Sequence, residues 1–167
     1  MGLLNDVMND FLKKQALELA RRMSPGAPAR ATVDIDRRTA MHFIVASGVC
    51  FLDVTEKSYP RNLVFKCLSE LCREFLLNYS SAEILDPDLR AWKFITFDIT
   101  IQKTKKAFAH LHRSGNLQSM AEDEVTQNIP IMAVTDVVAL PGQGGSGKGK
   151  GGKAEDTEGF GYLPLGL

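Results

Sequence analysis

The sequence predicts an α+β fold, in which an antiparallel β-sheet packs against α-helices and a flexible tail follows. Three observations support this class. Short β-rich runs with alternating apolar and polar residues occur between residues 32 and 54, and apolar residues recur at helical spacing over residues 61–79. From residue 143 onwards, glycine and charged residues replace most of the apolar residues that a core needs.

The composition is that of an ordinary soluble domain. The chain has 167 residues, 44% of them hydrophobic and 24% charged, which suits one domain with a tail. Its formal net charge is zero, so no general electrostatic attraction draws it to nucleic acid or to an acidic membrane. No apolar run reaches the ~20 residues that a membrane helix needs, so we expect no membrane span.

Residues 3–23 are expected to form the first helix, because apolar residues recur near helical spacing and lysines and arginines supply a polar face. The run SPGAP at 24–28 ends it. Ser47-Gly48 is a two-residue link with glycine second, which is typical of a tight hairpin. Three antiparallel strands are predicted around it, at residues 32–36, 41–46 and 49–54.

A second helix is predicted over residues 61–79, with one apolar stripe toward the sheet and polar residues mainly on the opposite side. The stripe consists of Val64, Cys67, Leu68, Leu71, Cys72 and Phe75. The polar side consists of Asn62, Lys66, Ser69, Glu70 and Arg73. A loop marked by Asp86-Pro87 follows at residues 80–90.

Residues 94–101 support two interpretations. Apolar residues occupy every second position from Ile95 to Ile101, as in a strand, and their β propensity is strong. The residues that follow, up to Ser114, suit a helix. From the residues alone, a strand followed by a helix is favoured over one continuous helix.

The chain changes character near Pro130. Residues 129–142 are apolar and β-branched, so we expect a domain over residues 1–128 and an extended segment after it. Residues 143–167 contain a Gly- and Lys-rich run that cannot build a core, and are expected to form a disordered tail.

The run GQGGSGKG at 142–149 is close to the phosphate-binding pattern G-x-x-x-x-G-K-[S/T]. Gly142, Gly147 and Lys148 are in register. Gly149, however, stands where the magnesium-binding hydroxyl belongs, and the glycines that follow do not support a helix. A linker is therefore favoured, and a nucleotide-binding enzyme that uses residues 142–148 is the weaker alternative.

The remaining polar residues form no catalytic or metal-binding pattern. His110 and His112 are two positions apart, whereas metal pairs on a helix are four apart, and His42 is expected to pack in or beside the core. The cysteines, which form no C-x-x-C pair, are expected to be buried thiols: Cys50, Cys67 and Cys72. We expect no catalytic residue, no cofactor and no metal site.

Two charged groups are interpreted as solvated surface. Asp34 and Asp36 alternate with apolar neighbours and are expected to lie on the solvated face of a strand. Lys103, Lys105 and Lys106 are expected to lie on a solvated helix face, with contact to acidic lipid headgroups or an acidic partner as the alternative.

Several motifs are specific in combination. They are the turn and strand GVCFLDV, the Tyr59-Pro60 step, the helix start NLVF, the ending LCREF, the run FDITIQKTKKAF and the segment RSGNLQS. Together they resemble the longin domain of ER–Golgi vesicle-trafficking SNAREs, in the branch called Sec-twenty-two. KKQALELARRMSP, at residues 13–25, is similar to that family's first helix. The likeness covers roughly residues 13 to 128.

The resemblance implies a five-stranded, longin-like (profilin-like) antiparallel sheet with one helix on one face and two on the other. It makes the 94–101 stretch the start of a helix that runs to about His112. It also implies a non-catalytic binding platform, cytoplasmic and peripheral to ER and Golgi membranes. Its partners would be SNARE, coat or tether proteins of the early secretory pathway, and a scaffold for a small GTPase or tethering complex is the alternative.

Two departures from the family pattern matter. Where the family has a first β-hairpin, MGLLNDVMNDFL favours a helix, so strand 49–54 would have an unpaired edge. Where the family has a SNARE helix and a membrane anchor, this sequence has Pro130, a β-branched run and the Gly/Lys tail. Membrane fusion by this chain alone is therefore not expected.

The expected contact surface is the edge of strand 49–54 with the groove beside the second helix. Residues 131–140 are expected to dock there in the free protein and to be displaced by a partner. The residues predicted to take part in this protein interaction are Val49, Phe51, Asp53, Val64, Leu68, Ile131, Val134 and Val137.

Overall fold

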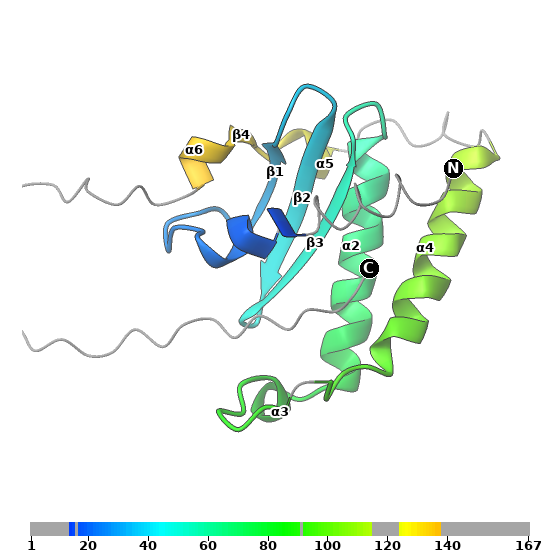
Figure 1. Ribbon diagram of the computed structural model, residues 1–167. Coiled ribbons are helices and arrows are strands. Elements are labelled where there is room, and N and C mark those ends of the chain that lie inside the picture. Colours follow the sequence, from blue (N-terminus) through cyan, green and yellow to red (C-terminus); the bar gives the residue numbers. More distant parts are fainter. Residues whose placement is uncertain (1–13, 16, 91, 115–123, 138–167) are drawn as a thin grey trace, which may run out of the picture.

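The computed structural model describes residues 14–15, 17–90, 92–114 and 124–137, and these form an α+β arrangement of layers (Figure 1). The strands are β1 (Arg30–Asp34), β2 (Thr39–Ala46), β3 (Val49–Glu56) and β4 (Ile131–Ala133). The helices are α2 (Arg61–Asn78), α3 (Ser81–Ile84), α4 (Phe97–Arg113), α5 (Glu124–Gln127) and α6 (Val134–Val137). Residues 14–15 and 17–21 are also helical, in agreement with the predicted first helix.

The four strands form one sheet in the order β3-β2-β1-β4. The first three are antiparallel, as predicted, whereas β4 lies parallel to β1, with Ile131 opposite Thr32. The sheet is therefore mixed rather than purely antiparallel. Within residues 129–137, the part of the expected segment 129–142 that the structure describes, residues 131–133 alone form a strand, and α6 follows directly.

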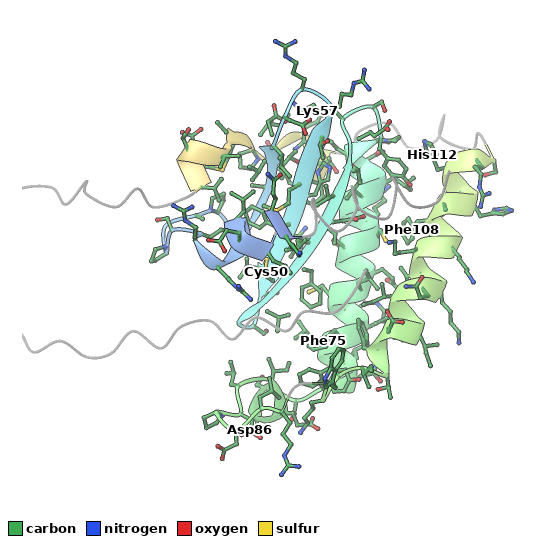
Figure 2. All side chains as sticks on the ribbon, viewed as in Figure 1. Cys50, Lys57, Phe75, Asp86, Phe108 and His112 are labelled. Atoms are coloured by element: carbon green, nitrogen blue, oxygen red, sulfur yellow. The ribbon has the colours of Figure 1, made fainter. Side chains whose placement is uncertain are left out.

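Each face of the sheet carries its own hydrophobic core. The side chains of Ile44 and Phe51 belong to the core under α2 and α4, where Phe75 packs edge-on against Phe51 with ring centroids 5.7 Å apart. Figure 2 labels Phe75 on α2. The opposite face holds a second core: Ala31, Val33, Met41, Phe43 and Val137 are buried there, and Leu19 and Met23 pack against it. Helices thus lie on either side of the sheet.

The interpretation of residues 94–101 as a strand is wrong. Residues 92–96 form turns, and α4 runs from Phe97 to Arg113, which confirms the helix implied by the family resemblance. The aromatic rings of the core decide the outcome, because Phe75 packs against both Phe94 and Phe97 with centroid separations of 5.2 and 5.0 Å. A strand would place side chains three residues apart on opposite sides, so both rings could not pack against Phe75.

Two polar positions differ from expectation. Asn62 is 3% exposed rather than solvated, because it lies in the first turn of α2, where the chain enters the core. Asp36 lies beyond the end of β1, not within it, and its carboxylate accepts the backbone N–H groups of Arg38 and Thr39 at 2.7 Å each. These two bonds lower the pKa of Asp36 and hold the β1–β2 turn.

Asp34 is exposed, as expected, and its carboxylate pairs with Lys57 at 3.1 Å. Among the described residues, no helix has both the length and the apolar character needed to cross a membrane. The predictions for residues 3–13, for the phosphate-loop-like run at 142–149 and for the tail at 143–167 lie outside the described residues.

Candidate interaction surfaces

The edge of β3 is the first candidate surface, because within the described part of the chain no strand pairs with its outer side. Ser47 and Gly48 both have positive φ, 52° and 76°, as a two-residue type I′ hairpin requires. In such a hairpin the flanking residues, Ala46 and Val49, form a hydrogen-bonded pair, and hydrogen-bonded pairs alternate along the ladder. The backbone groups of Cys50, Leu52, Val54 and Glu56 therefore point to the open edge.

Asp53 closes part of that edge. Its carboxylate accepts the outward N–H of Val54 at 2.9 Å, so the outward donors left along β3 are those of Cys50, Leu52 and Glu56. Burial raises the pKa of Asp53, while the charge of Lys105 on α4 and the bond from Val54 act in the opposite direction. Asp53 thus leaves fewer open backbone donors at this edge than the prediction for strand 49–54 assumed.

The apolar residues predicted for this site mostly lie beneath the surface. Phe51, Val64 and Leu68 are buried in the core under α2, at 8%, 2% and 2% exposure. Val49 is partly buried against the same core. In this conformation these residues pack beneath the β3 edge and α2 and expose little of their side chains. Their role in partner binding stays a prediction.

The predicted docking of residues 131–140 along strand 49–54 is wrong in its location. β4 pairs with β1, at the opposite edge of the sheet, and Val137 is fully buried in the second core. The backbone of Pro130 accepts the N–H of Thr32 at 2.9 Å, and Ser24 donates its N–H to the carbonyl of Val137 at 2.9 Å. These contacts lead the chain onto β1. Ile131 is exposed and Val134 only partly buried.

Arg61 ties this segment to the rest of the fold. Its guanidinium donates to the Ile129 carbonyl at 2.9 Å and to the Thr32 hydroxyl at 3.1 Å, and it lies 5.9 Å from the centre of the Phe65 ring. Sequence reasoning did not identify this role. The sequence does contain one signal for it, because Arg61 is the first residue of α2 and the helix dipole disfavours positive charge there. An arginine at such a position is expected to have a partner elsewhere in the fold.

His42 continues the same network into the sheet. Its ring nitrogens lie 2.9 Å from the hydroxyls of Thr32 and Thr55, one on each neighbouring strand. It is 1% exposed, and burial, with a smaller contribution from the charge of Arg61, lowers its pKa to about 4. His42 is therefore a neutral core residue, as expected, rather than an acid or base at a surface.

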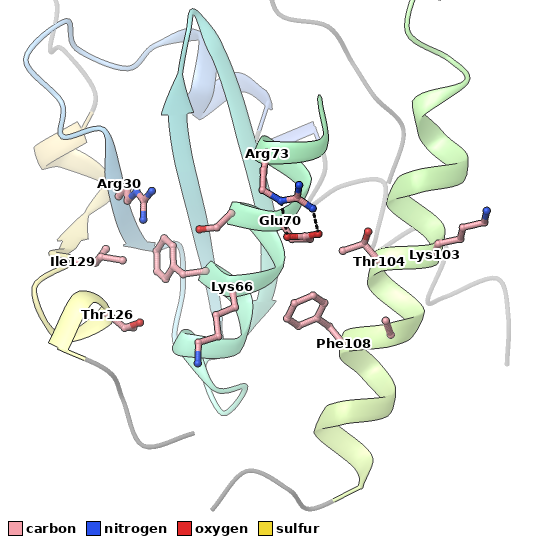
Figure 3. A pocket seen from close by; sticks show the side chains of 12 residues that line it. Arg30, Lys66, Glu70, Arg73, Lys103, Thr104, Phe108, Thr126 and Ile129 are labelled. Carbon is pink, nitrogen blue, oxygen red and sulfur yellow. Dashed lines mark hydrogen bonds and ion pairs between the residues drawn. The ribbon is translucent and has the colours of Figure 1, made fainter. Parts of the chain in front are cut away.

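A groove of about 760 Å³ between α2, α4 and the 126–129 turn is the second candidate surface (Figure 3). Phe65, Phe108 and Ile129 provide apolar walls. Glu70 also lines it and binds Arg73 through two bonds of 2.7 and 3.2 Å. Cationic side chains surround it: Arg30, Lys66, Arg73 and Lys103. An apolar groove with a cationic rim suits a peptide that carries apolar and acidic residues.

The described residues contain no candidate metal centre. No group of three or more His, Cys, Asp and Glu side chains lies close enough there to hold a metal ion. The three cysteines are free, and burial raises the pKa of Cys50 and Cys67 to about 11, so both stay protonated near neutral pH. His110 and His112 do not converge on a common site, and His112 instead stacks on Tyr59, with ring centroids 4.5 Å apart.

Comparison with curated proteins gives several relatives. "Protein transport protein sec22" of Schizosaccharomyces pombe is 36% identical over 108 residues, which cover 65% of this chain and 49% of that protein. "Vesicle-trafficking protein SEC22b" of Xenopus tropicalis is 31% identical over 127 residues, covering 75% of this chain and 58% of that protein. The chain thus spans about half the length of the curated relatives it matches.

The family comparison agrees with the architecture. Residues 3–101, more than half of the chain, match the model of the longin family, which is described as a regulated-SNARE-like domain. The α+β layers, the β2–β3 hairpin and the long helices α2 and α4 are the elements that the resemblance implied. The chain therefore belongs to the longin family of regulated-SNARE-like domains.

Proposed function

We propose that this chain is a non-catalytic interaction domain that regulates ER–Golgi vesicle transport. Family membership supports a regulatory, SNARE-like role, and the relatives named above are described as protein-transport and vesicle-trafficking proteins. On this proposal the domain acts at the cytoplasmic surface of ER and Golgi membranes. Its partners are SNARE, coat or tether proteins of the early secretory pathway.

The observation that carries the proposal is the open edge of β3 on a longin fold. Cys50 and Leu52 present outward N–H and C=O groups, and a partner segment in extended conformation can satisfy them by adding a strand. Backbone pairing supplies affinity in this mode, and side chains beside the edge select the sequence. Val49 and Asp53, which alternate with the outward groups, are then placed to contact alternate side chains of the partner.

The test removes one outward donor from the full chain. Leu52 forms a non-hydrogen-bonded pair with Phe43, so Leu52→Pro deletes an N–H that points to the open edge and leaves the β2–β3 hydrogen bonds intact. Leu52→Ala is the matched control, because it shortens the same side chain and keeps the N–H. Binding to purified cytosolic segments of early-secretory SNARE, coat and tether proteins is measured by calorimetry.

We expect the wild-type chain and Leu52→Ala to bind the same segment with similar affinity. Leu52→Pro should bind at least about tenfold more weakly, since one buried backbone hydrogen bond is lost and its partner carbonyl is left unsatisfied. Equal binding by all three proteins would show that β3 is not the contact. Failure of the wild-type chain to bind any segment would contradict the function itself.

A further inference from the structure

α4 has an outward face that, apart from Lys103 at the rim of the groove, neither the core nor the two candidate surfaces use. Figure 1 shows α4 as the outer layer of the molecule, on the far side of α2 from the sheet. Phe97 and Ile101 face inward and are 3% exposed. Ile95 and Ile99 are 53% and 61% exposed, although they are as apolar as the residues that the helix buries.

Trp92 extends this apolar face beyond the start of the helix. The N–H of Ile95 bonds to the carbonyl of Trp92 at 3.1 Å, and that of Asp98 bonds to the carbonyl of Ile95 at 3.1 Å. These bonds connect Trp92 to the first turn of α4, so Trp92 lies next to the end of the helix where Ile95 and Ile99 lie. Trp92 is 74% exposed and has φ of 72°, a conformation that is strained for a bulky residue.

The same face becomes basic toward the other end of the helix. At about 100° per residue, four basic residues fall within about 40° of Ile99 around the axis. They are Lys103, Lys106, His110 and Arg113, all exposed. Asp98 is the one acidic residue within α4 and lies about 100° away from Ile99. We name these seven residues the outer face of α4: Trp92, Ile95, Ile99, Lys103, Lys106, His110 and Arg113.

We propose that the outer face of α4 binds the surface of an anionic phospholipid bilayer. Tryptophan and isoleucine are suited to the boundary between headgroups and acyl chains, and lysine and arginine beside them attract acidic headgroups. The charge complementarity is local. The net charge of the whole chain is zero, so attraction depends on this face and acts within about 10 Å of the membrane at moderate salt.

This arrangement favours a bilayer over a protein groove. Three large apolar side chains stand exposed near the start of α4: Trp92, Ile95 and Ile99. A helix that lies at an interface needs apolar side chains on one side and cationic side chains that reach the headgroups. The inference is independent of the function proposed for the β3 edge, since α4 and β3 present different surfaces.

Trp92 is the only tryptophan of the chain, so its fluorescence reports on this face alone. The full chain is mixed with phosphatidylcholine vesicles, with or without phosphatidylserine, and both flotation and tryptophan emission are recorded. We expect flotation and a blue-shifted emission only with the anionic vesicles, and we expect added salt to reverse both. Absence of both signals would overturn the proposal.

Variants separate the two halves of the face. Lys103→Gln with Lys106→Gln should lower the partition coefficient about thirtyfold, whereas the equally exposed pair Arg37→Gln and Arg38→Gln should leave it unchanged. Ile95→Ser with Ile99→Ser should lower it at least about tenfold. Ile131→Ser, at an exposed apolar residue on β4, should have no effect. Circular dichroism checks that each variant is folded.

Other occupants give distinct results. A blue shift that grows with protein concentration in the absence of vesicles would assign the face to a second copy of the chain and overturn the proposal. Equal flotation of the wild-type chain and both double variants would also overturn it. If the double variants lose vesicle binding but still bind a protein segment at β3, the outer face of α4 binds the membrane and the β3 edge binds the partner independently.

Discussion

The buried imidazole of His42 shows how a single residue links stability to pH. A neutral imidazole has one donor and one acceptor nitrogen, and the hydroxyls of Thr32 and Thr55 complement both. Burial disfavours the charged form of His42, and a proton there would also add a second positive charge near Arg61, so the folded protein holds the pKa at about 4. The unfolded chain has the ordinary value near 6.5.

The sign of the effect follows from those two pKa values. Between them the unfolded state binds the proton and the folded state does not, so stability rises with pH. We expect the His42 contribution to be complete above about pH 6.5, and stability to fall by about 2 kcal/mol between about pH 7 and about pH 5. Urea unfolding at these two pH values measures it.

His42→Gln should remove most of this pH dependence, because glutamine keeps a donor and an acceptor but does not titrate. His110→Gln, at an exposed histidine, should behave like the wild type. The raised pKa of Asp53 makes stability fall as pH rises, which is opposite to the effect of His42. Because the wild type and both histidine variants contain Asp53, its effect cancels in the comparison. A slope that persists unchanged in His42→Gln would contradict the assignment.

At the scale of the element, α2 depends on the stripe that its sequence predicted. Leu68 and Leu71 are 2% and 7% exposed, and each packs in the core between α2, the sheet and α4. Leu68→Ala or Leu71→Ala should each lower the free energy of unfolding by about 2–5 kcal/mol, through lost burial and the cavity that remains. Leu77 is 71% exposed in the same helix, so Leu77→Ala should cost less than about 0.5 kcal/mol.

Chemical denaturation of the three variants measures these differences. A small effect at both Leu68 and Leu71 would mean that the helix does not pack on the sheet as described.

The start of α4 shows why sequence alone could not decide one element. An apolar residue at every second position contains two pairs at i,i+4 spacing, Ile95 with Ile99 and Phe97 with Ile101. A helix places these pairs on different sides, burying one and exposing the other, whereas a strand would place all four on one side. The aromatic partner Phe75, distant in sequence, selects the helix. Local propensity carries no information about that contact.

At the scale of the whole molecule, the sequence correctly predicted the antiparallel strands β1, β2 and β3 and the helix α2. Both predictions rest on local signals, namely the spacing of apolar residues and the residues of the turns. The docking of the segment after Pro130 was predicted, but its edge was wrong. Which edge it joins depends on contacts that no local pattern encodes, chiefly Arg61 to the Ile129 carbonyl and Val137 in the second core. The network at Arg61, Thr32 and His42 was missed for the same reason.

The docked segment gives the last prediction. Val137→Asp would place a carboxylate at a fully buried site of the second core, which costs several kcal/mol unless the segment undocks. We expect undocking: residues 131–137 should leave β1 while the β2–β3 hairpin stays folded. Amide hydrogen exchange should then become faster at Thr32, whose N–H bonds to the Pro130 carbonyl, and stay slow in the core of β2.

Thr135→Asp is the matched control, because it adds the same charge to an exposed position of α6. It should leave exchange at Thr32 unchanged. If the two variants exchange alike, Val137 does not hold the segment, and the fourth strand is stabilised by its backbone bonds and Arg61 alone. If Val137→Asp speeds exchange throughout β2 as well, the segment and the sheet unfold together, and β4 is an inseparable part of the domain rather than a strand that can be released.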